Sequence, residues 1–193
     1  YSNEASGLAS SAVGFRNKAA SENASAVGYG NNANALAASA VGYNNTAGGV
    51  GSSTIGYNNT ATNENASAFG YGNTAGGLAS SAFGFSNTAS GDNANAFGYN
   101  NIASGSKSNV FGTGNTVSGS SSTAVGTANE VAAENSTAIG NNNTISSGAE
   151  NSAALGNNIS ISLKDSVALG NNSTATAINS VTGNSSYTCL LYT

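Results

Sequence analysis

The stretch Ser80-Ser81-Ala82-Phe83-Gly84, followed by Asn87-Thr88-Ala89-Ser90-Gly91, decides the fold. In both halves small residues occupy every second position, and this period of two is typical of β-strands. The triplet Ala82-Phe83-Gly84 recurs along the chain as a small or β-branched residue, a large apolar residue and a glycine. These glycines are spaced by 14 residues nine times in succession, then by 16, then by 14.

This regular spacing predicts an all-β solenoid with 14-residue coils. Two short strands of about five residues and two turns account for one coil, and strands of successive coils then pair in parallel. Roughly 12 coils at about 4.8 Å each give a rod about 58 Å long. The two extra residues fall between Ile145 and Asn151, where we expect a bulged turn.

The alternating small residues of both halves predict a narrow interior. One position of this set is an asparagine in ten successive coils. Because asparagine tolerates turn geometry and stacked copies can bond to one another, we expect a structural turn ladder here. We call it the asparagine ladder: Asn17, Asn31, Asn45, Asn59, Asn73, Asn87, Asn101, Asn115, Asn129 and Asn143.

Alternation also predicts that one strand of each coil points large apolar side chains outward. We call this set the apolar stripe: Val13, Val27, Val41, Ile55, Phe69, Phe83, Phe97, Phe111, Val125, Ile139, Leu155 and Leu169. Two positions further along lies the aromatic column: Phe15, Tyr29, Tyr43, Tyr57, Tyr71, Phe85 and Tyr99. A continuous apolar surface marks an interface, and parallel rods arranged around a rotation axis would bury it.

Composition excludes several functions. The 193 residues carry a net charge of −4, no His and one Cys. Without His there is no imidazole base, and the acidic residues are scattered, so we expect no enzyme, no cofactor and no metal site. Only four basic residues are present, which argues against nucleic-acid binding. The longest apolar runs are far below the roughly 20 residues of a membrane span, so this segment should make no membrane contact.

The segment Asp165-Ser166-Val167-Ala168-Leu169-Gly170-Asn171-Asn172-Ser173 resembles the repeat of YadA-like head domains in trimeric autotransporter adhesins, as do residues 134–140 and 151–156. The resemblance implies a left-handed parallel β-roll, a homotrimer and a non-catalytic head on the bacterial surface. Such heads bind extracellular matrix proteins or host and other cell surfaces. In complete family members a stalk and an outer-membrane anchor follow, and we expect these to lie outside this fragment.

The repeat divides the chain into three parts. Residues 1–176 are the expected YadA-like head repeats, and residues 177–188 are a degenerate end of the array. Residues 189–193, which include Cys189, have no match to the repeat and read as a non-native, adapter-derived tail.

Alternative functions remain at this point. A purely structural, fibre or ice-binding β-solenoid shares the repeat, although the threonines at Thr46, Thr60, Thr74 and Thr88 form a single, interrupted column. Two interpretations of the aromatic column are open: its rings fill the space between chains, or they face a ligand. Asn-x-Ser/Thr triplets such as Asn58-Asn59-Thr60 match the glycosylation acceptor pattern, but a chain this rich in these residues is expected to contain them.

Overall fold

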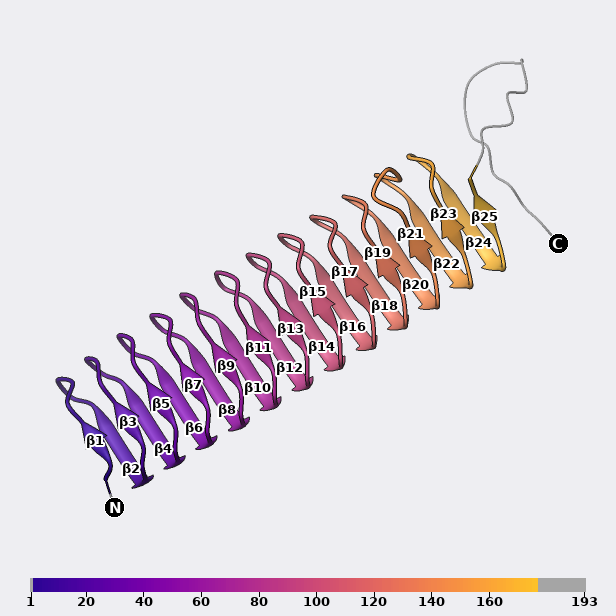
Figure 1. The fold of residues 1–193 in the computed structure, drawn as a ribbon. Helices are drawn as coiled ribbons and strands as arrows, with labels where there is room; N and C mark the ends of the chain where they lie inside the picture. The colour runs from indigo at the N-terminus through magenta and orange to yellow at the C-terminus, as the bar shows by residue number, and fades with distance from the viewer. Residues whose placement is uncertain (1, 177–193) are drawn as a thin grey trace, which may run out of the picture.

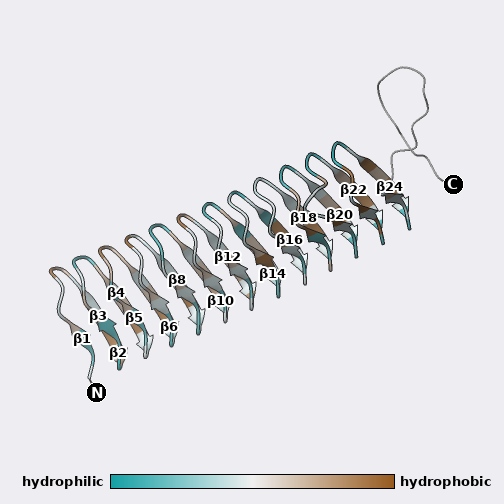
Figure 2. Ribbon diagram, turned by 45° about the horizontal axis from the view of Figure 1, so that its top comes forward, coloured by the Kyte–Doolittle hydropathy of each residue, from teal (hydrophilic) through white to brown (hydrophobic). Residues whose placement is uncertain are grey.

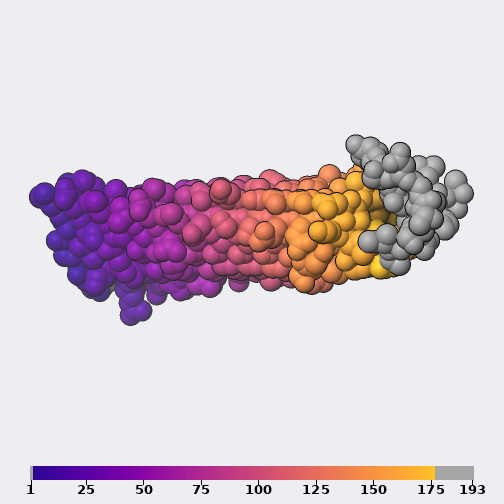
Figure 3. Space-filling model, turned by 90° about the horizontal axis from the view of Figure 1, so that it is seen from above, coloured from indigo at the N-terminus to yellow at the C-terminus, as the bar shows by residue number. Residues whose placement is uncertain are grey.

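The computed structural model describes residues 2–176, which form a rod of two parallel β-sheets (Figure 1). Successive strands alternate between the sheets, so each full coil contributes one strand to each. None of residues 2–176 is helical, so this part of the chain has no helix that could cross a membrane. The first and last strands lie at opposite ends of the rod, whose narrow outline Figure 3 shows. Residues 177–188 and 189–193, with Cys189, lie outside the described residues.

Within residues 2–176 the larger sheet, so called for its longer strands, consists of twelve five-residue strands. They are β2 (Ser11–Phe15), β4 (Ser25–Tyr29), β6 (Ser39–Tyr43), β8 (Ser53–Tyr57), β10 (Ser67–Tyr71), β12 (Ser81–Phe85), β14 (Asn95–Tyr99), β16 (Asn109–Thr113), β18 (Thr123–Thr127), β20 (Thr137–Asn141), β22 (Ala153–Asn157) and β24 (Val167–Asn171).

Over the same described residues the smaller sheet, so called for its shorter strands, consists of thirteen two-residue strands. They are β1 (Glu4–Ala5), β3 (Lys18–Ala19), β5 (Asn32–Ala33), β7 (Thr46–Ala47), β9 (Thr60–Ala61), β11 (Thr74–Ala75), β13 (Thr88–Ala89), β15 (Ile102–Ala103), β17 (Thr116–Val117), β19 (Glu130–Val131), β21 (Thr144–Ile145), β23 (Ser160–Ile161) and β25 (Thr174–Ala175).

The parallel solenoid with two strands per coil is therefore confirmed, but the second strand is shorter than the predicted five residues. The second turn begins directly after it. In the turn after β11, the Ser80 backbone N–H and hydroxyl both donate to the Gly77 carbonyl, at 3.2 and 2.8 Å. Because this tight turn occupies the residues between β11 and β12, only Thr74 and Ala75 remain extended.

Strand pairing follows the sequence period without slippage. Ser67 pairs with Ser81 and Thr74 with Thr88, an offset of 14 residues. Across the insertion the offset is 16, as Thr144 pairs with Ser160, and it returns to 14 where Ser160 pairs with Thr174. The additional residues lie in an exposed turn, where a Cβ added to Gly148 would meet no atom within 4 Å. The predicted bulged turn is thus confirmed.

Two turn positions in each coil require a left-handed backbone. Asn58 (φ 56°) lies in the first turn and Asn65 (φ 57°) in the second, and asparagine adopts this region more readily than most residues. The glycine near the end of each long strand has a stricter role. Gly84 has a φ of 118°, and a Cβ there would lie 2.1 Å from the Gly98 carbonyl oxygen. Only glycine permits this approach between coils.

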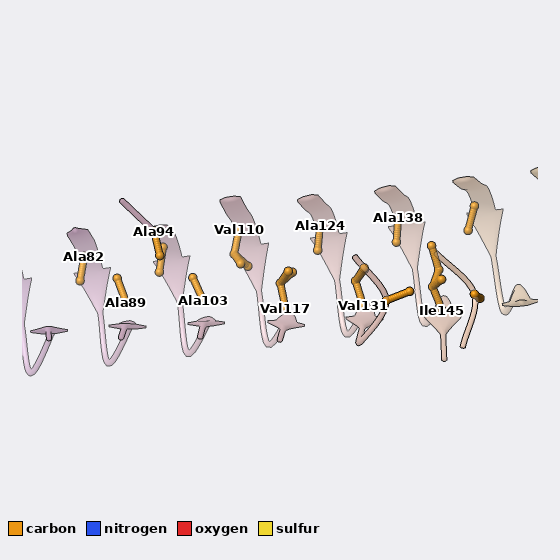
Figure 4. Close-up of a cluster of buried hydrophobic side chains, with 14 of the residues drawn as sticks. Ala82, Ala89, Ala94, Ala103, Val110, Val117, Ala124, Val131, Ala138 and Ile145 are labelled. Atoms are coloured by element: carbon orange, nitrogen blue, oxygen red, sulfur yellow. The ribbon is translucent and has the colours of Figure 1, made fainter. Parts of the chain in front are cut away.

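The interior between the sheets is narrow and changes in composition along the rod. Among the described residues up to β15, every buried apolar side chain is alanine, such as Ala82, Ala89 and Ala103 (Figure 4), and these alanines share the interior with the buried asparagine ladder. Beyond that point larger side chains enter it, among them Val110 and Ile145. All are completely buried. The alternation of inward and outward positions thus separates a small-residue core from the outer faces.

Candidate functional site

The ten residues of the asparagine ladder lie at the first turn, buried and stacked one per coil. At Asn73, the backbone N–H donates to the Asn59 side-chain oxygen at 2.9 Å. The Asn73 Nδ2 lies 2.9 Å from the same oxygen and 2.7 Å from the Gly84 carbonyl oxygen. Its own Oδ1 accepts two bonds from Asn87, both 3.0 Å long. Each side chain therefore bonds to the coils on both sides.

The same bonding extends beyond the residues singled out from the sequence. The Asn17 backbone N–H donates to Asn3 Oδ1 at 3.0 Å, so Asn3 is an earlier member of the column. It stands 14 residues before Asn17, and the period could have identified it. At the other end, the Ile159 backbone N–H donates to Asn143 Oδ1 at 3.0 Å. Isoleucine has no side-chain acceptor, so the asparagine bonding stops there.

All twelve residues of the apolar stripe lie on the outer face of the larger sheet, one in each long strand. Eight are exposed, from 36% at Val41 to 59% at Val13, and the other four are half-buried. Figure 2 shows hydrophobic colour on long strands such as β22 and β24. The arrangement brings the twelve side chains into one continuous row along the rod.

The aromatic column lies on the same outer face and is stacked throughout. Its neighbouring ring centroids are 4.7–5.2 Å apart, with planes within 15° of each other. Phe69, Phe83, Phe97 and Phe111 of the apolar stripe stack in the same way, at 4.7–5.3 Å. Because the faces of stacked rings cover one another, mainly ring edges are left for contact with another molecule.

The outer face of the smaller sheet is polar. It presents Thr46, Thr60, Thr74 and Thr88 in one column, interrupted further along by Ile102 and Glu130. Near the first coil an exposed ion pair joins Lys18 Nζ to Glu4 at 3.7 Å. The two outer faces of the rod thus differ sharply in polarity.

A further apolar row, which the sequence reading overlooked, lies on the second turn. Leu8, Leu36, Val50 and Leu78 are all exposed and stand 28, 14 and 28 residues apart, with Glu22 and Glu64 at the same position in the coils between. These multiples of the coil length are the signal that could have revealed them. Within residues 2–176, no group of three or more His, Cys, Asp or Glu side chains is arranged to hold a metal ion. The prominent features of the described rod are therefore its repetitive surfaces.

Comparison with known families agrees with this arrangement. The family described as the YadA head domain repeat (2 copies) matches residues 5–31, 19–45, 47–73, 75–101, 118–143 and 164–181, well over half of the chain. No curated protein matches the chain. The 14-residue coils, their parallel pairing and this match together show that the chain belongs to the YadA head family.

Proposed function

We propose that this rod is the non-catalytic head of a trimeric autotransporter adhesin on a bacterial surface. Three copies pack side by side through the outer face of the larger sheet, and the remaining surface contacts extracellular matrix proteins or other cells. The observation that carries the proposal is the apolar stripe, which the isolated chain leaves open to solvent along the rod.

The energetic argument concerns the area that association would bury. Full burial of a large apolar side chain is worth about 1.5–3 kcal/mol, and since these side chains are already partly covered, on the order of 1 kcal/mol each remains available. Twelve such residues in line exceed what a soluble monomer ordinarily exposes. Because every coil repeats the same outward residue, parallel rods can contact one another along their whole length with cyclic symmetry.

The polar outer face and the turns are left for a ligand. Thr60, Thr74 and equivalent residues recur at each coil, so a rod carries many similar contacts instead of one deep pocket. Three rods in an assembly multiply these contacts, and linked weak contacts raise the overall affinity far above that of one contact. Repetition of this kind suits a large, repetitive partner such as a matrix protein. The left-handed winding and the anchorage to the outer membrane stay predictions from the family.

The oligomeric state tests the assembly. The mass of residues 1–176 in solution, measured by light scattering, is expected to be that of three chains. A variant with Phe69→Ser, Phe83→Ser, Phe97→Ser and Phe111→Ser is expected to be monomeric. The matched control places serine on the opposite face of the same coils, with Thr74→Ser, Thr88→Ser, Ile102→Ser and Thr116→Ser, and should remain trimeric. A stable monomeric parent rod would contradict the proposal.

Binding is tested separately with the trimeric rod. Surfaces coated with collagen, fibronectin or laminin are expected to retain the parent trimer. The assembly-deficient variant should be retained much less, because avidity is lost. Failure to bind any matrix protein or cell surface, by a rod that is trimeric, would refute the adhesive role while leaving the assembly intact.

A further inference from the structure

The Asn-x-Ser/Thr triplets of the chain fall at particular places in the fold. Residues 2–176 contain nine of them. Eight begin at an exposed turn asparagine with positive φ, and none begins at a member of the asparagine ladder. Five of the eight occupy the same position in the first turn and form what we call the acceptor column: Asn44, Asn58, Asn142, Asn158 and Asn172.

The register of the coil explains this separation. The residue two positions after Asn58 is Thr60, on the outer face of the smaller sheet, whereas the residue two positions after the buried Asn59 is Ala61, inside the rod. From β3 to β25, the second residue of each short strand points inward and is Ala, Val or Ile. In this turn, a serine or threonine therefore stands two positions after an asparagine only when that asparagine is exposed.

The remaining triplets are less suited as acceptors. Those that begin at Asn23, Asn65 and Asn135 place their hydroxyl residue on the outer face of the larger sheet, beside the apolar stripe. The ninth begins at Asn171, and its Ser173 hydroxyl donates to the Leu169 carbonyl at 2.6 Å.

In the acceptor column the reacting groups face solvent. Asn44 and Asn58 are exposed, and within the described residues no side-chain hydrogen bond engages their amides or the hydroxyls of Thr46 and Thr60. The ladder amides, in contrast, are buried and fully bonded, as at Asn59. The side-chain nitrogens of Asn44 and Asn58 are thus available to an enzyme, and those of the ladder are not. Further along the acceptor column, Asn142 Nδ2 donates to Asn158 Oδ1 at 2.9 Å, so Asn142 is less accessible to an enzyme.

We infer that the acceptor column is a row of sites for N-linked glycosylation, an inference independent of the adhesive function. A glycosyltransferase would join the asparagine Nδ2 to the anomeric carbon of a phosphate-activated sugar. The bond from that carbon to the donor phosphate oxygen breaks, the phosphate-containing group leaves with the electron pair, and the amide nitrogen loses one proton to a base of the transferase. The activated donor is either a nucleoside diphosphate sugar or a lipid-linked oligosaccharide.

The experiment is peptide mapping by mass spectrometry of the full chain isolated from the cells that produce it. Sugar is expected on Asn44 and Asn58 and absent from the ladder residues Asn45 and Asn59. A single hexose would identify a nucleoside diphosphate donor, and a preassembled oligosaccharide would identify a lipid-linked donor; either result supports the inference. Unmodified peptides across the whole acceptor column would overturn it.

Two threonine variants made in the same cells provide the control. Thr60→Ala removes the triplet at Asn58 and should abolish sugar on that residue alone. Thr74→Ala changes the equivalent threonine one coil further, where Gly72 replaces the acceptor asparagine, and should leave the pattern unchanged. Both threonines lie on the outer face, so both variants should fold. Sugar retained at Asn58 in Thr60→Ala, or found on the threonines, would exclude this chemistry.

Discussion

At the scale of single residues, the asparagine ladder contributes the most interactions per side chain. Replacing Asn73 by Ala removes the acceptor of the buried Asn87 N–H and the donor to the Gly84 carbonyl. A buried polar group left without a partner costs about 1–3 kcal/mol. We therefore expect Asn73→Ala to lower the free energy of unfolding by at least about 2 kcal/mol, measured by chemical denaturation.

The matched control at this scale is Asn141→Ala. Asn141 is exposed at the end of β20, and no side-chain hydrogen bond engages it among the described residues. Its replacement should change stability by less than about 0.5 kcal/mol, as is usual for surface sites. Equal losses in the two variants would mean that the ladder bonds contribute nothing beyond those that solvent provides.

At the scale of elements, the sequence predicts the coil better than the strands inside it. Alternation places Ala26 inside and Val27 outside, and both are found there. The length of the second strand could not be predicted, because Asn17-x-Ala19-x-Ser21 shows the same period of two although Ser21 already belongs to a turn. The positive φ of the glycine in each long strand was also hidden, since it depends on contact with the next coil.

The partner surfaces were predictable only in part. The apolar stripe and the polar column at Thr46, Thr60, Thr74 and Thr88 on the opposite face both follow from local alternation. The molecule that binds the polar face is not part of this chain, so no pattern within the sequence can identify that molecule. The exposed row at Leu8, Leu36 and Leu78 was missed because it lies in a turn, where strand alternation gives no guidance.

The two-residue insertion gives the prediction at the scale of elements. Ser147 and Gly148 are exposed, and the bonds between coils are kept on both sides of them: the Ser146 N–H donates to Ile161 O at 2.9 Å and the Asn151 N–H to Glu134 O at 3.1 Å. Because a modest change in loop length costs well under about 1 kcal/mol, deleting both residues should leave thermal stability nearly unchanged in a calorimetric scan.

The same deletion in an ordinary turn should behave differently. Removing Ala132 and Ala133 takes away a fully buried side chain and leaves the coil too short for its register. Several kcal/mol of stability should be lost, because packing and strand pairing are both disturbed. If the deletion of Ser147 and Gly148 proved equally damaging, the insertion would have to have a structural role of its own.

At the scale of the whole molecule, the rod has two unlike parts. In the described coils up to β15 the buried apolar side chains are all alanine and a stacked aromatic column lies outside, whereas later coils bury Val117, Val131 and Ile145 and lack that column. Solenoid stability is approximately a sum over coils and their interfaces. Each additional buried methylene adds about 0.8 kcal/mol, so the later coils should be more stable by themselves, and the earlier coils should depend more on association.

Hydrogen exchange can measure this difference. When the parent protein is diluted until it dissociates, backbone amides of β6–β10 should exchange faster than those of β18–β20, and assembly should protect the first group more than the second. Both groups lie at least two coils from an end of the rod, so fraying does not bias the comparison. Uniform exchange along the dissociated rod would mean that outward aromatic stacking compensates within one chain for the smaller interior, and the earlier coils would then need no partner for their stability.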